Sequence, residues 1–334
     1  MTISGPPDLI VENQSQRILL ERLTRIATTD AEILITGPSG VGKELYARHA
    51  HAASRRRDAP FVVVNCSNLN GDMLENEVFG HARGAYTGAH AAGVGLATAA
   101  EGGTLFLDEV DALPLPSQAK LLRFIQQREY RRLGETLVRR ANVRFIAASN
   151  SDLPTLVSRG HFREDFYYRL RVAPIAIPAL AARPDDIVPL TAHFITRAAI
   201  EYGVAPIVLD AAVVDNLQHY AWPGNVRELE NLIRYLTCLQ LGRPVECADV
   251  GVLITGDAFS PPPPAAQSLL EGPMQDAKEA LVTQFEQAYI GQALENSHGN
   301  ITHAAAQAGK NRRAFFELMR KHGIVRVPVR APPA

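Results

Sequence analysis

The sequence contains little cysteine and no excess of either charge. Its 334 residues include three cysteines, Cys66, Cys238 and Cys247, and their spacing excludes both a metal-binding motif and an even disulfide framework. We therefore expect reduced thiols and a cytoplasmic location. The formal net charge is −1, which excludes a surface that is basic or acidic as a whole. Any surface that binds nucleic acid must therefore be local.

Long apolar runs are absent as well. No stretch approaches the ~20 apolar residues that cross a bilayer, and the N-terminus lacks the charged-then-apolar pattern of a signal peptide. We therefore expect no membrane segment. The sequence also has no internal repeat. Its apolar content of 46% is nevertheless enough for a packed core, and its length predicts two or three domains.

A glycine-rich stretch at residues 37–44 is the most informative motif. It follows an apolar run that predicts a buried strand and precedes a segment that predicts a helix. In this context the loop turns its backbone N–H groups towards phosphate oxygens, and the helix N-terminus adds positive partial charge. The alternative is a glycine-rich turn with a surface lysine, which the flanking strand and helix disfavour. The candidate nucleotide-binding residues are Gly37, Pro38, Ser39, Gly40, Val41, Gly42, Lys43 and Glu44.

A second apolar strand ends in two carboxylates, Asp108 and Glu109. Asp108 is suited to hold Mg²⁺, directly or through water, and Glu109 to take a proton from an attacking water. Two further strands end at Asn65 and just before Asn150, where parallel strands face a ligand crevice. Asn65 is either a site residue or a strand cap. Asn150 either orients the attacking water or senses the γ-phosphate, or it is an ordinary turn residue.

Strands and helices alternate between residues 31 and 177, which predicts a parallel sheet with helices on both faces. The expected strands are residues 32–36, 61–65, 104–108, 143–148 and 173–177. From residue 179 to 254 the pattern is helical, with helices expected at residues 187–202, 211–219 and 226–241. Arg227 lies in the first turn of the last of these, where a cation opposes the helix dipole. Such a placement makes sense if an anion lies opposite.

Residues 255–273 contain a run of prolines and predict an extended linker. Helices expected at residues 285–295, 301–308 and 312–322, with a turn at Gly309, indicate a helix-turn-helix at residues 274–325. From residue 300 onward the chain has seven lysines and arginines but one acid, Glu317. This favours binding to a phosphate backbone over a solvated helical tail. The candidate DNA-binding residues are Asn300, Lys310, Asn311, Arg312, Arg313, Arg320 and Lys321.

Two further stretches carry no assignment from composition alone. Residues 84–89 place Tyr86 and Thr87 between glycines, which suits either a loop that displays the tyrosine or an ordinary loop with a packed one. Arg163 and Arg169 lie six residues apart in a predicted helix, where arginines are often solvated surface charges.

Taken together, these motifs resemble the sigma-54-dependent bacterial transcription activators, the enhancer-binding branch of the AAA+ ATPases. The resemblance covers about residues 8–324. Residues 37–44 are similar to the Walker A motif of this branch, in which Glu commonly follows the Lys, and residues 105–109 to its Walker B motif. Residues 84–89 are similar to its signature loop, with Tyr86 where Phe is usual. The tail is similar to a Fis-type helix-turn-helix.

The resemblance implies a role for each remaining candidate. Arg163 and Arg169 would be fingers that reach a neighbour's γ-phosphate in a ring, usually a hexamer. Arg227 would be the second sensor and Asn150 the first, and Asn65 would hold Glu109 until the target engages. The residues implied to contact sigma-54 are Gly84, Ala85, Tyr86, Thr87, Gly88 and Ala89.

The sequence departs from the family pattern at Leu96-Ala97-Thr98, where an Arg-Phe-Glu run is usual. We also expect the family's N-terminal receiver or sensor domain to be absent. We therefore expect control by a trans-acting regulatory protein or by expression level.

The expected domains are an AAA+ α/β subdomain at residues 8–178, a helical lid at 179–254, the linker and the DNA-binding tail. The expected function is an ATP- and Mg²⁺-dependent activator of sigma-54 RNA polymerase holoenzyme that binds upstream double-stranded DNA. The alternative is a DNA-binding regulator whose ATPase controls only its assembly.

Overall fold

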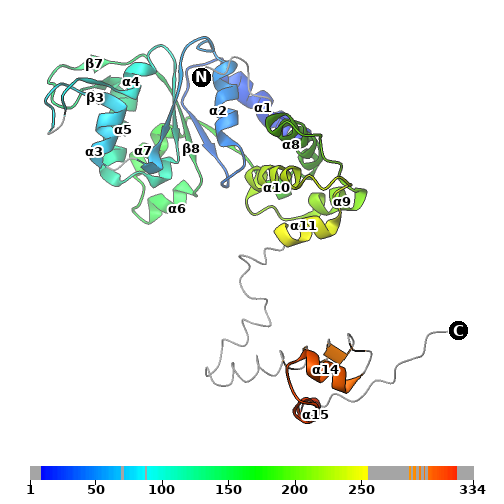
Figure 1. Cartoon of the computed structure of the whole chain (residues 1–334). Coiled ribbons are helices and arrows are strands. Elements are labelled where there is room, and N and C mark those ends of the chain that lie inside the picture. The colour runs from blue at the N-terminus through cyan, green and yellow to red at the C-terminus, as the bar shows by residue number, and fades with distance from the viewer. Residues whose placement is uncertain are drawn as a thin grey trace. The chain divides into compact units, whose positions relative to one another are not determined.

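The chain divides into two units, residues 1–254 and 255–334. The computed structural model describes residues 9–68, 71–86, 89–254 and 300–321, together with 286, 289–290, 293–294 and 297. Within this part of the chain, no helix has the length and apolar character needed to span a membrane. Figure 1 shows the helices and strands, coloured along the chain from the N-terminus to the C-terminus.

The first unit is built on a five-stranded sheet, and its strand order is β2-β5-β8-β1-β9. All four pairings are parallel, as the alternating pattern predicts. The expected strand ends are met to within one residue. The register aligns Asn65 with Asp108 and Thr36 with Ser149, so the carboxyl ends of these strands lie along one edge. The strands are β1 Ile33–Thr36, β2 Phe61–Asn65, β5 Thr104–Asp108, β8 Arg144–Ser149 and β9 Ala173–Ala176.

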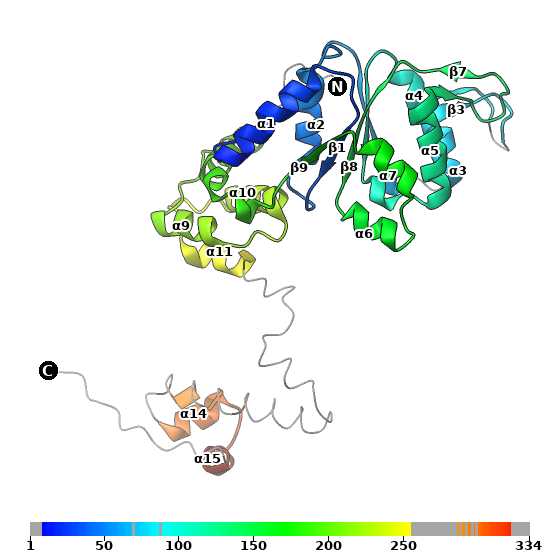
Figure 2. The ribbon, with the colours of Figure 1, turned by 180° about the vertical axis from the view of Figure 1, so that it is seen from behind.

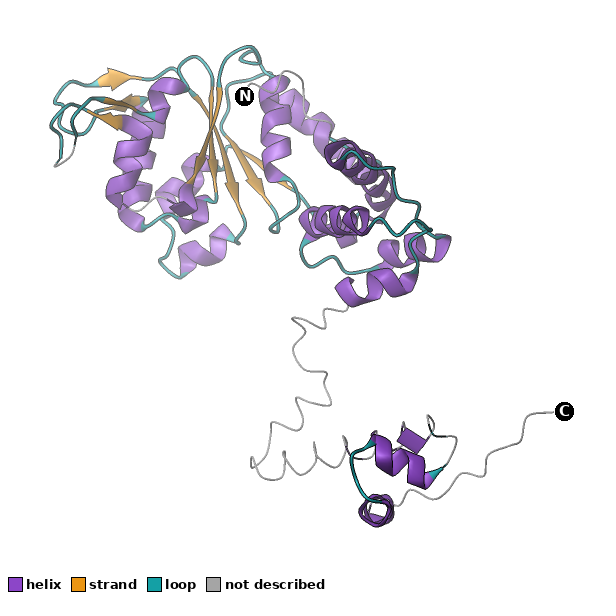
Figure 3. Ribbon diagram, viewed as in Figure 1, coloured by secondary structure: helices purple, strands orange, loops and turns teal. Residues whose placement is uncertain are grey.

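Helices cover both faces of the sheet because alternate strand residues point to opposite sides. Leu105 and Leu107 of β5 pack with α3, α5 and α7, whereas Phe106 packs with α1 and α2. Figures 2 and 3 show these two groups of helices on either side of the strands. The helices are α1 Gln14–Ala27, α2 Lys43–Ala52, α3 Gly71–Phe79, α4 Leu96–Ala99, α5 Leu115–Gln127, α6 Leu153–Ser158 and α7 Glu164–Leu170, with short 3₁₀ turns at Cys66–Asn68 and Val110–Ala112.

Two short antiparallel hairpins extend the unit beyond this sheet. Strand β3 Gly80–His81 pairs with β4 Gly93–Val94, and β6 Glu129–Tyr130 pairs with β7 Arg139–Arg140. Leu133 bonds to the backbone of both Gly80 and Ala82, so the two hairpins lie side by side. The sequence pattern did not predict them, because strands of two residues have no measurable periodicity.

The lid contains four helices in the described chain: α8 Ile187–Tyr202, α9 Ala211–His219, α10 Asn225–Leu239 and α11 Cys247–Ile254, preceded by 3₁₀ turns at Leu180–Ala182 and Pro184–Asp186. The bounds of α8 and α9 agree with the sequence prediction, and α10 begins one residue earlier than predicted. The lid core surrounds Trp222, which is 1% exposed and donates its indole N–H to the Leu217 carbonyl at 2.8 Å.

The second unit contains α14 Ile301–Gln307 and α15 Arg312–Lys321, packed around Phe315 and Met319. These two helices match the predicted helix-turn-helix closely. Of the expected helix at residues 285–295, the described residues 286, 289–290 and 293–294 are helical. The predicted linker at residues 255–273 lies outside the described residues.

Candidate nucleotide site and interaction surfaces

The phosphate-binding loop follows β1 and runs into α2, as the sequence predicts. Gly40 and Gly42 have φ values of 78° and 96°, a region that side chains with a Cβ rarely adopt. A Cβ on Gly40 would lie 2.3 Å from the Gly224 carbonyl oxygen of the lid. Glycine is therefore required at Gly40 both by the loop conformation and by the close approach of the lid.

The loop borders a cavity of about 590 Å³ between the sheet and the lid, a volume within the usual range for small-molecule sites. The predicted residues Ser39, Gly40, Val41, Gly42, Lys43, Glu44, Asp108, Glu109, Asn150 and Arg227 all line it. Apolar side chains come from the N-terminal segment and from α8, namely Leu9, Ile10, Leu190 and Phe194. The cavity thus combines a phosphate loop with apolar walls, which is what a nucleotide requires.

Lys43 is buried, and its ammonium group donates to the Gly37 carbonyl at 2.8 Å, the Pro38 carbonyl at 3.0 Å and the Asn150 Oδ1. Burial lowers the pKa of Lys43, while the nearby Asp108, Asp111 and Glu109 carboxylates oppose that shift. The three acceptors match the three ammonium hydrogens, so Lys43 is held across the loop.

Asp108 and Glu109 end β5 at the cavity. Burial raises the pKa of Asp108, and the Glu109 backbone N–H, donated to Asp108 Oδ1 at 3.0 Å, opposes the rise. Glu109 has φ 55°, a strained left-handed conformation that costs about 1–3 kcal/mol in a residue other than glycine. Its Oε1 accepts a hydrogen bond from Asn150 Nδ2 at 3.1 Å. Asn150 therefore bridges the ammonium of Lys43 and the carboxylate of Glu109.

Asp111 is a site residue that the sequence interpretation missed. Its Oδ1 accepts the Asn150 backbone N–H at 3.2 Å, and its Oδ2 accepts the Ser151 hydroxyl at 2.6 Å. These bonds fix the turn that carries Asn150. A third acid two residues after Glu109 was the available signal.

Asn65 contacts Ser67 in this conformation. Its Oδ1 accepts the backbone N–H of Ser67 at 2.9 Å and the hydroxyl of Ser67 at 2.6 Å, and among the bonds of the described residues Glu109 is held by Asn150 instead. The implied Asn65–Glu109 contact is thus not formed among the described bonds of this conformation, and the switch role of Asn65 stays a prediction. The reason is local, because an Asn at a strand end readily caps the next turn. Of the two interpretations of Asn65, this conformation has the cap.

The lid contacts the phosphate loop through the start of α10. Arg227 donates its backbone N–H to Gly40 O at 3.2 Å, and its Nη1 lies 3.3 Å from Ser39 Oγ. Asn225, also missed by sequence, donates from Nδ2 to Ser39 O at 2.9 Å and accepts the Leu180 N–H at 2.8 Å. The cation of Arg227 thus faces the phosphate side of the cavity, as its unfavourable position in the helix suggested.

Glu44 also lines the cavity, and its carboxylate accepts from Arg48 Nη2 at 2.6 Å, one turn further along α2. The donor set fits magnesium carried by a nucleotide, because Mg²⁺ is commonly bound by one or two carboxylates together with phosphate oxygens. Asp108 supplies such a carboxylate beside the loop. Among the described residues, no cluster of three or more His, Cys, Asp or Glu side chains forms a separate metal site.

Arg163 and Arg169, which the sequence treated alike, lie in different surroundings. Arg163 is 42% exposed and pairs with Asp165 at 2.7 Å, within the first turn of α7. Arg169 donates to Glu32 Oε1 at 2.9 Å, and Arg128 donates to the same oxygen at 2.7 Å. Glu32 is buried. Arg163 is therefore available at the surface, whereas Arg169 is bound within its own chain.

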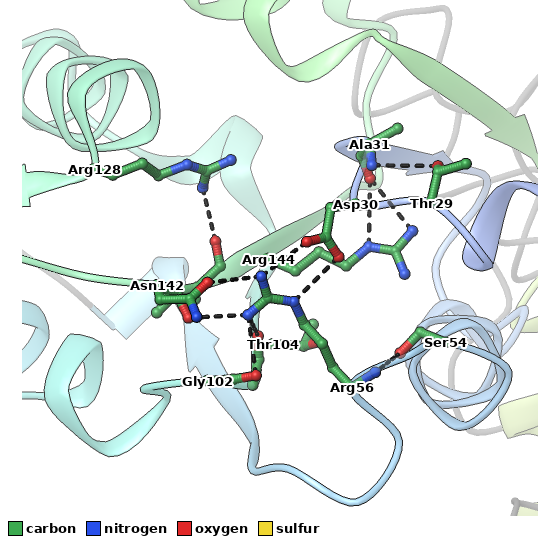
Figure 4. Close-up of polar contacts among 12 residues, drawn as sticks. Thr29, Asp30, Ala31, Ser54, Arg56, Gly102, Thr104, Arg128, Asn142 and Arg144 are labelled. Carbon is green, nitrogen blue, oxygen red and sulfur yellow. Dashed lines mark hydrogen bonds and ion pairs between the residues drawn. The ribbon is translucent and has the colours of Figure 1, made fainter.

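A second cluster of charges lies at the amino ends of the strands. Arg144, the first residue of β8, is 1% exposed and donates to the Ala27 carbonyl at 2.9 Å. Arg56 binds Asp30 at 2.9 Å and the Gly102 carbonyl at 3.0 Å, and Figure 4 shows these contacts together with Arg144 beside Ala31. These arginines tie chain segments together at the sheet edge opposite the cavity.

The signature loop rises from the β3–β4 hairpin. Tyr86 is 45% exposed and lies 5.1 Å from the His81 ring, centroid to centroid. His81 contacts Asn76 Oδ1 at 2.6 Å and the Ala91 carbonyl at 3.1 Å. The Gly84 N–H donates to the Ala89 carbonyl at 2.9 Å, which closes the base of the loop. The predicted residues Thr87 and Gly88 lie outside the described residues, and Ala85 bonds from its N–H to Ala82 O at 3.2 Å.

The unusual stretch at Leu96-Ala97-Thr98 forms the short helix α4. Ala97 is buried, and the Thr98 hydroxyl lies 2.7 Å from the Tyr130 hydroxyl of the neighbouring hairpin. The neutral Thr98–Tyr130 contact therefore lies in the stretch where the family that this sequence resembles usually has charged residues.

In the tail, two of the predicted DNA-binding residues are helix caps. Asn300 Oδ1 accepts the Thr302 N–H at 3.1 Å, and Asn311 Oδ1 accepts the Ala314 N–H at 2.8 Å. The remaining candidates are exposed, and two of them form surface pairs: Arg313 lies 3.5 Å from Glu317, and Lys321 lies 3.5 Å from Glu286. The exposed cations are Lys310, Arg312, Arg313, Arg320 and Lys321.

Comparison with known families identifies all three parts. The Sigma-54 interaction domain family matches residues 9–176, the AAA+ ATPase lid domain family matches residues 181–265, and the Fis family of bacterial regulatory proteins matches residues 281–322. These matches follow the order in which the sheet, the lid and the tail occur in the chain.

Individual relatives cover most of this chain. The transcriptional regulatory protein GlrR of Escherichia coli is 41% identical over 310 residues, 91% of this chain and 65% of its own length. The sigma54-dependent transcriptional regulator SfnR of Pseudomonas fluorescens is 38% identical over 332 residues, 97% of this chain and 90% of its own. This chain thus spans just under two thirds of GlrR but nearly all of SfnR.

Solved structures agree with the fold. NtrX from Brucella abortus in complex with ATP has a TM-score of 0.70 at 32% identity, covering 95% of this chain and 69% of NtrX. Its complex with ADP gives a TM-score of 0.71 at the same identity. The matched domains, their order and the geometry of the phosphate loop lead to one conclusion: this chain belongs to the sigma-54-dependent transcriptional regulators, AAA+ proteins with a Fis-type helix-turn-helix.

Proposed function

We propose that this protein binds ATP with Mg²⁺ in the cavity and hydrolyses it within a ring of identical subunits, usually six in this family. Hydrolysis would remodel sigma-54 RNA polymerase holoenzyme in the cytoplasm, at promoters whose upstream double-stranded DNA the tail binds. The observation that carries the proposal is the bridge of Lys43, Asn150 and Glu109. This bridge connects Lys43, the candidate phosphate-binding cation, to Glu109, the candidate general base, beside the same cavity.

The chemistry follows from these contacts. Bound Mg-ATP supplies the γ-phosphoryl group and shields its charge. The Lys43 ammonium exchanges a loop carbonyl for phosphate oxygens, and the loop N–H groups stabilise the charge that develops on them. Asn150, which bonds to both Lys43 and Glu109, is placed to orient the attacking water. Glu109 then takes a proton from that water.

Completion of the site by a neighbouring subunit is supported by the contrast between the two arginines. Arg163 is exposed, and its partner Asp165 lies in the same helical turn, so exchange for a neighbour's γ-phosphate needs no change in the core. Arg169 is bonded to Glu32. In this conformation that bond connects α7 to the residue just before β1. Both remain candidates for the finger role, and Arg163 is the one already at the surface.

Contact with sigma-54 is proposed for the loop that carries Tyr86. The direct experiment mixes the protein with sigma-54, ADP and a metal fluoride, and measures formation of a stable complex. Tyr86→Phe is the matched variant, because it removes one hydroxyl and keeps the ring. We expect the complex to form with both proteins and to be stronger with Tyr86→Phe, which restores the usual apolar contact.

The alternative function is a DNA-binding regulator whose ATPase controls only assembly. Two observations favour it: the hydroxyl of Tyr86, and the neutral Thr98–Tyr130 contact at the position of a usual charged run. Absence of any sigma-54 complex while ATPase activity is intact would support this alternative and reject the proposed remodelling. Control by a trans-acting regulatory protein is part of either proposal.

DNA binding by the tail is supported by its exposed cations. Affinity for promoter DNA should fall with salt, and Arg312→Ala should reduce the slope of log affinity against log salt by about one. Glu317→Gln is a useful control, because it releases Arg313 without removing a cation. Binding that survives deletion of residues 300–322 would contradict the assignment.

A further inference from the structure

The N-terminal segment before α1 forms part of the nucleotide cavity. Leu9 packs against the core on the α1–α2 face of the sheet, whereas Ile10 packs against the lid core, and both side chains line the cavity. The segment therefore passes from one subdomain to the other at the cavity wall. None of the proposed catalytic steps uses this segment. Its position at the cavity wall must therefore be fixed by contacts with other parts of the chain.

The residue that holds this segment is Asp186, at the start of the lid. Asp186 is fully buried, and its Oδ1 accepts the backbone N–H groups of Glu12 and Asn13, each at 2.7 Å. Its neighbour Asp185 is exposed and accepts only the Asn13 side chain, at 2.9 Å. Hydrogen bonds from backbone N–H groups to a buried carboxylate are strong and directional, so Asp186 fixes the path of the backbone.

Arg183 connects this anchor to the phosphate loop. It is 3% exposed and lines the cavity, and its Nη1 lies 3.7 Å from Asp186 Oδ2 while its Nη2 donates to the Val41 carbonyl at 3.1 Å. Within the described residues, Arg183 Nε and Asp186 Oδ2 have no hydrogen-bond partner. A buried ion pair that is incompletely bonded contributes little to stability. The pair instead connects the N-terminal segment, the start of the lid and the phosphate loop around one cavity.

We propose that Asp186 is a positioning residue for ATP affinity. By holding the backbone at Glu12 and Asn13, it keeps Leu9 and Ile10 as an apolar wall against which the nucleobase packs. This inference rests on the proposed function, because it takes ATP to be the occupant of the cavity. It predicts that loss of the anchor weakens the binding of ligands that carry a base and leaves binding at the phosphate loop intact.

The first test compares Asp186→Ala with Asp185→Ala, using dissociation constants for ATP and for inorganic triphosphate. Asp186→Ala should weaken ATP binding about tenfold, the usual effect of a defect in an apolar pocket, and leave triphosphate binding unchanged. Asp185→Ala should bind both ligands as the unchanged protein does. Equal weakening of both ligands by Asp186→Ala would overturn the proposal, as would no change in either.

A second test keeps Asp186 and removes one of its donors. Asn13 has φ −61°, a value that proline adopts, so Asn13→Pro deletes the N–H without forcing that angle. Asn13→Ala retains the N–H and loses the side-chain cap equally, which makes it the matched control. ATP affinity should fall in Asn13→Pro relative to Asn13→Ala, whereas equal affinities would overturn the proposal. If the unchanged protein binds neither ATP nor triphosphate, the proposed function fails instead.

Discussion

The amino edge and the carboxyl edge of the central sheet both contain buried charges, but the charges at the two edges have different kinds of partner. At the amino edge, Arg144 and Arg56 bond to backbone carbonyls and to Asp30, and those partners tie chain segments together. At the carboxyl edge, Lys43 and Glu109 line a cavity and share Asn150, a partner that we propose each exchanges when a nucleotide binds. Burial of charge therefore does not mark a functional site by itself. Access to a cavity and exchangeable partners do.

The strongest test of this contrast removes the proposed chemistry at the carboxyl edge. Glu109→Gln and Arg163→Ala should each lower the ATPase rate about 10³-fold, because one removes the base and the other the neighbour's cation. Mixed in equal amounts, the two inactive proteins should regain activity at those sites that combine an intact Glu109 with a neighbour's intact Arg163. Steady-state ATPase assays measure all three samples. A mixture as inactive as its components would contradict a shared site.

At the amino edge, the corresponding substitution should affect folding instead. Arg144→Met keeps much of the side-chain volume but leaves the carbonyls of Ala27 and Ala31 without their donor. We expect a loss of about 2–3 kcal/mol in the free energy of unfolding, the scale of unsatisfied buried polar groups. ATPase activity per folded molecule should stay unchanged. Urea unfolding together with active-site titration measures both quantities, and a selective loss of activity would remove the distinction between the edges.

A pair of glycines sharpens the comparison. Gly40 and Gly102 have similar φ values, 78° and 75°, but a Cβ on Gly40 would meet the lid carbonyl at 2.3 Å, whereas no described atom lies within 4 Å of a Cβ on Gly102. Gly102→Ala should cost about 1 kcal/mol of stability through backbone strain alone. Gly40→Ala should in addition weaken ATP binding, by about tenfold. Equal ATP affinities of the two variants, measured by calorimetry, would contradict a tight contact between loop and lid.

The smallest expected effects concern pH. Burial raises the pKa of Asp108 above its ordinary value of 3.8, so its charged form opposes folding at neutral pH and stability is gained as pH falls through the raised pKa. Arg56 lowers the pKa of Asp30 below 3.8, so stability is lost as pH falls through the lowered value. Because Asp30 is largely exposed, its contribution should be under about 1 kcal/mol.

Asp108→Asn should therefore stabilise the nucleotide-free protein at pH 7, and Asp30→Asn should destabilise it slightly. Thermal unfolding at pH 7 and at pH 4 measures both changes. Destabilisation by Asp108→Asn at pH 7 would show that the contacts of this carboxylate outweigh its burial.

The strands and most helices could be predicted from the sequence because each depends on neighbouring residues. An apolar run that ends in Asp108 and Glu109 predicts a buried strand that reaches a ligand edge, and the structure places β5 at those residues. The phosphate loop was equally local, since its glycines, lysine and flanking elements are continuous in the chain. The hairpins around Leu133 could not be predicted, because their pairing depends on residues far apart and their strands are too short to show a pattern.

The partners of the site residues needed the tertiary structure. Nothing near Lys43 in sequence indicates Asn150, which lies 107 positions away, and nothing near Asp186 indicates Glu12, 174 positions away. The sequence offered no reason to distinguish Arg163 from Arg169. They differ in the structure because Glu32 lies close enough to bond to Arg169. The sequence left two interpretations of Asn65 open, and only the structure shows that its side chain bonds to Ser67 in this conformation.

By itself, the sequence determined the order of strands and helices, the phosphate loop, the carboxylates at a strand end and the basic tail. These features depend on local backbone preference and on the periodicity of burial, which a linear pattern records. The tertiary structure decided which side chains meet. The parallel sheet brings the ends of distant strands to one edge, and the lid and N-terminal segment close over it. Contacts of this kind depend on chain topology, so Asn225, Asp111 and Asp186 gained their significance only in the folded protein.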